Sequence, residues 1–89
     1  MEDSKREELE SIIKKVCNAV DNVTDYYLFG TVGKEQWCED RGFVELTVYW
    51  SSTKTGDDWE ETWYIYEDGK ISAGDYGNFD NVEQLEHNL

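Results

Sequence analysis

Apolar residues recur at helical spacing near the start of the chain. The polar positions between them form the opposite face of the same helix. Ser4 and Glu7 match a capping box, in which a serine and a glutamate three residues later satisfy free backbone N–H groups. The pattern predicts one amphipathic helix at about residues 4–21. Its apolar face consists of Leu9, Ile12, Ile13, Val16 and Val20.

After Asp25 the pattern changes to aromatic and β-branched residues interrupted by glycine. Such runs predict strands, here at residues 26–32, 43–50 and 58–66. The dipeptide Asp68-Gly69 favours a two-residue type I′ turn, which would return the chain into a short fourth strand at residues 70–73. These elements predict an antiparallel meander.

A second helical signal ends the chain. Asp80 and Glu83 match another capping box. The element order predicts an α+β fold with an N-terminal helix, a three- to four-stranded antiparallel β meander and a short C-terminal helix. The chain contains no proline, no internal repeat and no low-complexity linker, so we expect residues 1–89 to form a single compact domain. The apolar stripe of the second helix consists of Phe79, Val82, Leu85 and Leu89.

Side chains of a strand alternate between its two faces, which divides the strand residues into two sets. We expect one set to face the core. It consists of Val44, Leu46, Val48 and Trp50 in the second strand and of Trp59, Trp63 and Ile65 in the third. Glu61 falls out of pattern on that face, and the first strand does not show which of its faces is buried. The opposite face of the second and third strands carries Glu45, Tyr49, Glu60, Tyr64 and Tyr66.

Three interpretations of this aromatic and acidic face stay open. It is a solvated binding surface, the ordinary outer face of an antiparallel sheet in which Tyr and Thr are simply good strand formers, or a second apolar layer covered by the C-terminal helix. Tyrosine supplies large contact area and is enriched at binding hot spots. Carboxylates two positions apart on a strand lie about 6.6 Å from each other, a spacing comparable with that of successive phosphates on a nucleic-acid strand.

The charge of the chain narrows the class of partner. The sequence has 21 acidic residues against 8 lysines and arginines, a formal net charge of -13. Residues 57–89 hold ten acidic residues, with Lys70 as the only base, a net charge of -9. Such a field repels nucleic acid and anionic membranes and attracts basic partners. Four Trp, six Tyr and three Phe argue against disorder in spite of this charge.

Sequence patterns for membrane insertion and export are not found. No apolar run approaches the roughly 20 residues of a membrane span, and the first residues are charged rather than signal-like. We therefore expect a cytoplasmic protein. Cys17 and Cys38 lack a C-x-x-C spacing and are expected to be free thiols, and Cys38 is a weak nucleophile candidate because acidic residues follow it.

Catalytic and metal-binding signatures are also not found. His87, the only histidine, lies four residues after Glu83, as in an exposed helical pair. Oxygen ligands at Asp75, Asn78, Asp80 and Glu83 raise the question of calcium, but their spacing does not match an EF-hand loop. We expect no enzyme activity, no metal and no cofactor.

The candidate site is therefore a partner-binding surface around the third strand. In the stretch GDDWEETWYIYEDG, residues 56–69, carboxylates and aromatic residues alternate without a base. Glu39 and Asp40 are further acidic positions of lower rank. The candidate contacts are Glu45, Asp57, Asp58, Glu60, Glu61, Tyr64, Tyr66, Glu67 and Asp68.

In charge, size and element order the chain resembles the small phage-encoded inhibitors of bacterial defence, in particular the acidic anti-CRISPR proteins that act as DNA mimics. The resemblance includes no motif. It implies a non-enzymatic inhibitor that occupies the basic groove of a nucleic-acid-binding effector such as a Cas nuclease, inside a bacterial host cell. Binding would involve no direct contact with nucleic acid or membrane.

Two other functions stay open. The first is an immunity protein that neutralises a basic nuclease toxin with the same acidic surface. The second is an acid–base hydrolase that uses two of the carboxylates. A hydrolase requires burial to raise the pKa of one carboxyl group, which an exposed acidic cluster does not provide.

Overall fold

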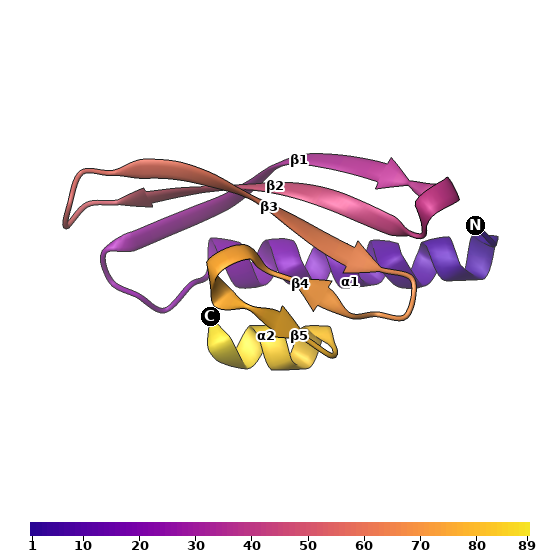
Figure 1. Ribbon diagram of the computed structural model, residues 1–89. Helices are drawn as coiled ribbons and strands as arrows, with labels where there is room; N and C mark the ends of the chain where they lie inside the picture. Colours follow the sequence, from indigo (N-terminus) through magenta and orange to yellow (C-terminus); the bar gives the residue numbers. More distant parts are fainter.

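The computed structural model describes residues 1–89 as two α-helices, five β-strands and two 3-10 helices (Figure 1). The predicted α+β class is confirmed, and a very short fifth strand extends the predicted meander. The elements are α1 (Asp3–Asp21), β1 (Leu28–Cys38), η1 (Glu39–Arg41), β2 (Phe43–Ser52), β3 (Asp58–Tyr66), β4 (Ile71–Ser72), η2 (Gly74–Tyr76), β5 (Asn78–Phe79) and α2 (Val82–Asn88).

The first helix begins before the predicted capping box. Its N-cap residue is Glu2, which makes no side-chain hydrogen bond, so the box of Ser4 and Glu7 is wrong. The backbone N–H of Arg6 donates to the Glu2 carbonyl at 3.0 Å. The guanidinium of Arg6 also lies 4.6 Å from the ring centroid of Trp37 in β1. This contact joins the start of the helix to the sheet.

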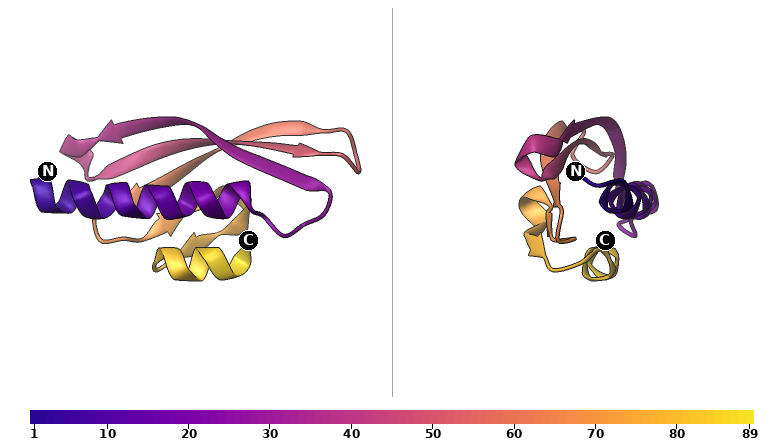
Figure 2. Two further views of the ribbon diagram at one scale, coloured as in Figure 1. Left: turned by 180° about the vertical axis from the view of Figure 1, so that it is seen from behind. Right: turned by 90° about the vertical axis from the view of Figure 1, so that its right-hand side faces the viewer.

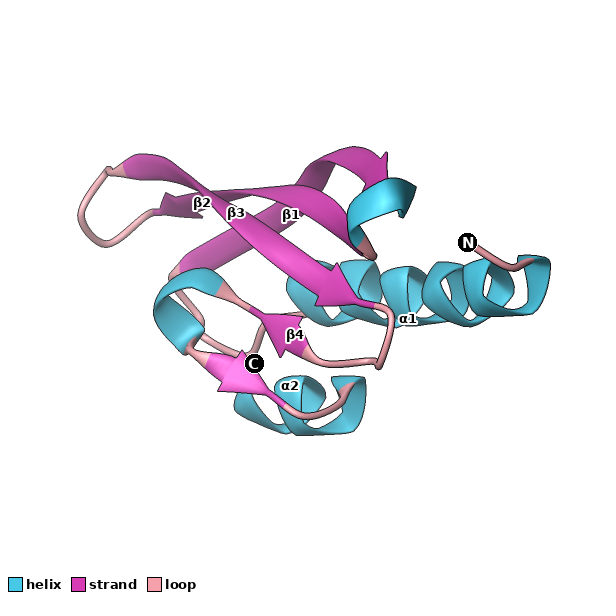
Figure 3. Cartoon of the chain, turned by 45° about the vertical axis from the view of Figure 1, so that its right-hand side comes forward, coloured by secondary structure: helices cyan, strands magenta, loops and turns pink.

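The strands form one antiparallel sheet in the order β1-β2-β3-β4-β5, so neighbours in sequence are neighbours in space (Figure 3). β3 has the predicted bounds, and β2 continues two residues beyond its predicted end. The register places Phe43 opposite Tyr66 and Ser51 opposite Asp58 in the β2–β3 pair. This register decides which side chains share a face.

β1 differs most from its prediction, because it starts two residues later and ends six residues later. The side chain of Asp25 accepts a hydrogen bond from the backbone N–H of Tyr27 at 2.9 Å, and this local turn delays the strand. At Gly33 the register shifts between Val32 and Lys34, which marks a β-bulge. The glycine therefore bends the strand instead of ending it.

The turn between β3 and β4 is not the predicted type I′ turn. That type requires positive φ at both central residues, but Gly69 has φ +89° and no non-glycine residue of the chain has positive φ. The Tyr66 carbonyl accepts from the Gly69 N–H at 2.9 Å, and the Tyr66 N–H donates to the Lys70 carbonyl at 2.9 Å. These bonds define a three-residue loop, a type I turn followed by a G1 bulge. Asp68 accepts from the Lys70 N–H at 3.0 Å, which closes the loop.

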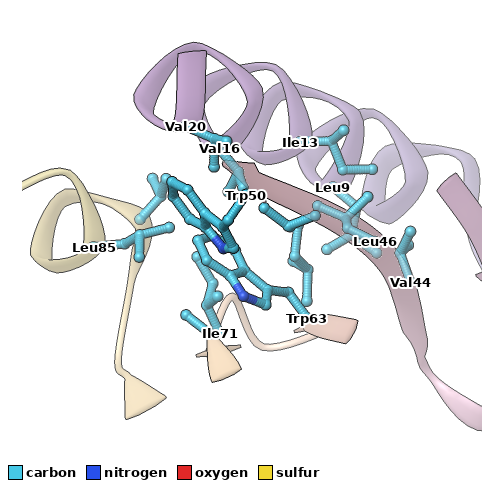
Figure 4. Close-up of a cluster of buried hydrophobic side chains, with 14 residues drawn as sticks. Leu9, Ile13, Val16, Val20, Val44, Leu46, Trp50, Trp63, Ile71 and Leu85 are labelled. Carbon is cyan, nitrogen blue, oxygen red and sulfur yellow. The ribbon is translucent and has the colours of Figure 1, made fainter. Parts of the chain in front are cut away.

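The core lies between the helices and one face of the sheet, here called the inner face (Figure 4). The predicted inward residues of β2 are all buried, as are four of the five apolar residues predicted for α1, with Ile12 half-buried. Trp50 and Trp63 lie side by side at the centre, with ring centroids 6.2 Å apart. The buried residues are Leu9, Ile13, Val16, Val20, Val44, Leu46, Val48, Trp50, Trp63, Ile65, Ile71, Ala73, Val82 and Leu85.

Trp59 is the exception among the predicted core residues of β3. It stands opposite Trp50 and therefore on the inner face, but its exposed fraction is 40%. The β2–β3 hairpin projects beyond the end of α1 (Figure 1). No helix covers this projecting end, so the prediction that Trp59 is buried was wrong.

The N-cap of the second helix lies one residue later than predicted. Asn81, not Asp80, is the N-cap, and its side chain accepts from the Gln84 N–H at 3.0 Å. The Gln84 side chain accepts from the Asp80 N–H in return. The sequence placed Phe79 in the apolar stripe of the second helix. In the structure it lies in β5, opposite Ile71. Val82 and Leu85 are buried, in agreement with the predicted stripe.

Both helices lie on the same side of the sheet (Figure 2). α2 packs beside α1, and the Lys15 ammonium lies 3.8 Å from a Glu83 carboxylate oxygen between them. The backbone N–H of Thr24 also donates to the Leu89 carbonyl at 3.0 Å. The other face of the sheet is therefore left without a covering layer. Neither helix combines the length and the apolar character needed to cross a bilayer.

Candidate partner-binding face

The tyrosines of β2 and β3 lie on the uncovered face of β1, β2 and β3, here called the open face. The C-terminal helix packs beside α1 on the inner side, so the tyrosines of β2 and β3 do not form a second core. The outward positions of the open face are Phe29, Thr31, Lys34, Gln36 and Cys38 in β1, Phe43, Glu45, Thr47, Tyr49 and Ser51 in β2, and Asp58, Glu60, Thr62, Tyr64 and Tyr66 in β3.

Three aromatic rings form a cluster at one end of the open face. Phe43 contacts Tyr64 and Tyr66 edge-on, with ring centroids 5.5 and 6.2 Å apart, and the two tyrosine rings stack at 6.4 Å. The guanidinium of Arg41 lies 5.6 Å from the Phe43 centroid. Tyr64 is half-buried and Tyr66 is exposed, so both predicted aromatic contacts lie on the open face. Their cluster already has a cation from its own chain.

The open face carries three carboxylates, on Glu45, Asp58 and Glu60, and a single base, Lys34. Glu45 stands opposite Tyr64 in the cross-strand register, and Glu60 stands opposite Tyr49. The chain forms five ion pairs within 4.0 Å, and none of them includes these three carboxylates. Their negative charge is therefore not neutralised by a close basic partner.

Glu61 lies apart from the open face, although the sequence places it in the same acidic run. It stands opposite Val48 on the inner side, and its Oε2 accepts a hydrogen bond from the Asp75 backbone N–H at 2.7 Å. Burial raises the pKa of the nearby Tyr76 phenol, and the carboxylates of Glu61 and Asp25 raise it further. Glu61 thus joins β3 to η2 and contributes to the fold rather than to the open face.

The remaining predicted carboxylates lie at opposite ends of β3. Asp57 is exposed just before the strand, whereas Glu67 and Asp68 belong to the turn after it. A nine-residue strand separates them by roughly 30 Å. The Lys70 ammonium lies 4.0 Å from Asp68, and the Glu67 carboxylate lies against Gly42. The nine candidate residues therefore do not form one continuous cluster.

The lower-ranked acidic positions lie in η1. Glu39 forms an ion pair and hydrogen bond with Arg6 of α1, whose guanidinium also covers Trp37. Asp40 is exposed. Glu39 therefore has a partner within the fold that the open-face carboxylates lack.

Sequence reasoning missed a groove that is lined mainly by outward residues of the open face, with the inward positions Gly30, Trp50 and Trp59 completing the lining between them. It has a volume of about 560 Å³ and lies at the projecting end of the hairpin, where Asp58 and Glu60 border it on β3. Phe29 of β1 and Tyr49 of β2 form its aromatic sides. Phe29 is 58% exposed and Tyr49 is 41% exposed. The sequence left the orientation of the first strand ambiguous, so Phe29 could not be placed beside these carboxylates.

The two cysteines and the histidine lie outside this surface or at its margin. Cys17 and Cys38 are free thiols, and Cys38 occupies an outward position at the end of β1. Burial raises the pKa of the Cys17 thiol, with further contributions from the charges of Asp21 and Glu35. His87 is exposed in the last turn of α2.

Of the side chains considered for calcium, Asp75 lies in η2, Asn78 in β5 and Glu83 in α2, and Asp80 lies between β5 and α2. Three or more His, Cys, Asp or Glu side chains do not come together anywhere in the chain in a way that could hold a metal ion.

Comparison of the chain with protein-family models, with curated proteins and with solved structures gives no match. The function must therefore be inferred from the open face itself.

Proposed function

We propose that the chain is a non-enzymatic binding protein that docks its open face on a basic, nucleic-acid-binding protein and inhibits it. The observation that supports this proposal is the uncovered sheet face, where Glu45, Asp58 and Glu60 have no basic partner within 4.0 Å. A nucleic-acid-binding groove is lined with Arg and Lys, and carboxylates on a rigid sheet offer the same donors an alternative to phosphate.

Aromatic residues give this face the second property of a docking surface. Tyr66 and Tyr49 are 40% and 41% exposed, and they lie in the same layer as the carboxylates. Tyr side chains lose little conformational entropy on binding and combine apolar area with a hydroxyl group. The carboxylates of this face would attract a basic partner electrostatically, and its aromatic rings would make the close contacts. The resemblance to acidic anti-CRISPR proteins makes a Cas effector the first partner to test.

The test is a pull-down of the tagged chain from lysates that contain candidate Cas effectors and nuclease toxins. Captured proteins are then challenged with duplex DNA and with rising salt. We expect a basic effector to be captured and then released by DNA and by salt, because competition for Arg and Lys and screening both weaken such a contact. A partner that ignores both challenges, or no captured protein, would contradict the proposal.

Matched variants make this test specific to the open face. The variant Asp57→Asn/Asp58→Asn/Glu60→Gln removes three charges at the projecting end of the hairpin and leaves Glu61 in place, because Glu61 stabilises the fold. The control Glu2→Gln/Glu7→Gln/Glu86→Gln removes three exposed helix-side charges that form no ion pair. We expect only the first variant to lose capture; equal losses would show that net charge alone attracts the partner.

The groove favours a second candidate, an immunity protein that neutralises a basic nuclease toxin. A depression of about 560 Å³ can receive a side chain of one particular partner, which favours recognition of a single protein over general attraction by charge. Such a protein would bind one toxin tightly. A DNA mimic would bind several basic proteins, each in competition with DNA. The number of distinct proteins captured in the pull-down separates the two candidates.

A further inference from the structure

We infer that the groove between Phe29, Tyr49, Asp58 and Glu60 is a subsite for an arginine side chain of the basic partner protein. This inference rests on the proposed function and names the contact by which the open face would hold its partner. Its basis is the pairing of free aromatic rings with free carboxylates in one depression.

The cross-strand register forms the depression. One row across the sheet is Phe29, Ser51 and Asp58, in which a small serine stands between a ring and a carboxylate. Strands lie about 4.8 Å apart, so the first and third members of a row are separated by about 10 Å. A flat guanidinium can enter that space above the serine, with one side against a ring and its edge toward a carboxylate.

The next row supplies the other side of the groove. It consists of Thr31, Tyr49 and Glu60, so a second ring and a second carboxylate stand one outward position along from the first row. Two carboxylates on alternate positions of β3 lie about 6.6 Å apart at their Cα atoms. Arginine is the matching cation, because its planar fork pairs with carboxylates and stacks on aromatic rings, whereas lysine is a compact point charge.

Gly33 gives Tyr49 the space it needs. A Cβ built on Gly33 would lie 2.2 Å from Cε2 of Tyr49, so the ring lies directly against the glycine of the β1 bulge. Gly33 does not itself line the groove. The β-bulge therefore fixes the position of one wall of the groove from outside it.

The charges and rings of this groove are not used within the chain. Arginine or lysine lies over Trp37, Phe43 and Tyr27, but no cation lies over Phe29 or Tyr49. No ion pair includes Asp58 or Glu60. The groove is thus the place on the open face where both halves of an arginine site remain free.

The test uses the peptide acetyl-Gly-Arg-Gly-amide as probe and follows the backbone amide signals of the ¹⁵N-labelled full chain by NMR. We expect the shifts to concentrate at groove residues such as Thr31, Ser51 and Asp58. The lysine peptide should bind more weakly, and the neutral citrulline peptide should not bind. Shifts spread evenly over the acidic surface, or equal binding of the arginine and citrulline peptides, would overturn the inference.

Variants separate the groove from general attraction by charge. Tyr49→Ala removes one ring and Gly33→Ala displaces it, and each should weaken arginine-peptide binding roughly three- to fivefold, the range of an exposed cation–π contact. Asp58→Asn/Glu60→Gln should weaken binding more than Glu2→Gln/Glu86→Gln, which changes the net charge equally. Equal effects of the two charge pairs, with no effect of Tyr49→Ala, would overturn the inference.

The same variants distinguish failure of this inference from failure of the proposed function. If a basic effector is captured through Asp57, Asp58 and Glu60 but Tyr49→Ala binds it normally, the function stands and the arginine subsite is wrong. If no effector is captured although the peptide binds in the groove, the subsite stands and the proposed function is wrong.

Discussion

The indole ring of Trp50 in β2 lies directly on Gly30 in β1. A Cβ built on Gly30 would come within 2.4 Å of Cζ3 of Trp50 and 2.8 Å of Cγ1 of Val20. The glycine thus provides the space in which a fully buried tryptophan reaches α1. At Gly30, the sheet packs against α1 through Trp50 and Val20.

Gly30→Ala should therefore destabilise the fold by about 1–3 kcal/mol, the usual cost of overpacking. Urea unfolding followed by tryptophan fluorescence measures the change. Thr31→Ala, at the next and outward position, is the matched control and should stay within about 0.5 kcal/mol of the parent. An unchanged unfolding midpoint for Gly30→Ala would show that Trp50 has room to move.

Glu60 and Glu61 are adjacent in sequence and should behave in opposite ways. Glu61→Ala removes the acceptor of the Asp75 N–H and should cost about 1–2 kcal/mol of folding free energy. Glu60→Ala should leave the folding free energy within about 0.5 kcal/mol but weaken partner binding. Denaturant unfolding and a binding assay on both variants check the contrast, which would fail if Glu60→Ala proved the more destabilising.

At the N-terminus of α2, two adjacent residues, Asp80 and Asn81, should also differ in their effect on stability. Asn81→Ala should destabilise the chain by about 1 kcal/mol, because its side chain accepts the Gln84 N–H. Asp80→Ala should have a smaller effect, since only the backbone of Asp80 takes part in this cap. Thermal unfolding of both variants measures the difference. A larger loss of stability for Asp80→Ala than for Asn81→Ala would show that Asp80 is the cap, as the sequence predicted.

The Cys17 thiol should ionise only at high pH. Burial first, and then the charges of Asp21 and Glu35, raise its pKa above the ordinary value of 9.0. Because the thiolate is the reactive form, labelling of a Cys38→Ser variant should have its pH midpoint above 9.0. The same variant in denaturant should show the ordinary midpoint. A folded-state midpoint at or below the denatured one would contradict the effect of burial.

Much of the fold could be predicted from the sequence where one face of an element is buried. Alternation in β2 and β3 placed Val44, Leu46 and Trp63 correctly, because the core imposes a strict two-residue period on such strands. The apolar stripe of α1 was equally clear. The predicted first strand gave no such signal, since Tyr26 and Leu28 on one face compete with Tyr27 and Phe29 on the other. The residues of β1 beyond Gly33 lie along an edge of the sheet and are mostly exposed.

Some residues were assigned wrongly because their environment depends on the lengths of the elements and on contacts between distant segments. A local sequence pattern does not contain this information. Trp59 follows the inward period of β3, but whether it is covered depends on where α1 ends relative to the hairpin. Glu61 could be assigned to the fold only once η2 was known to lie against it. The groove brings Phe29 of β1 together with Tyr49 of β2 and with Asp58 and Glu60 of β3. It therefore follows from the register of three strands rather than from any motif.

The projecting hairpin also has a consequence for local stability. The part of the hairpin that projects beyond the end of α1 has sheet neighbours but no helix behind it, so fewer buried apolar contacts oppose its opening. Amide protons there should exchange with solvent through small local openings, while those beside Trp63 await global unfolding. A partner seated on the groove would then select the closed hairpin and slow this exchange. The end of the molecule that carries the groove is thus also the end that receives the least support from the core.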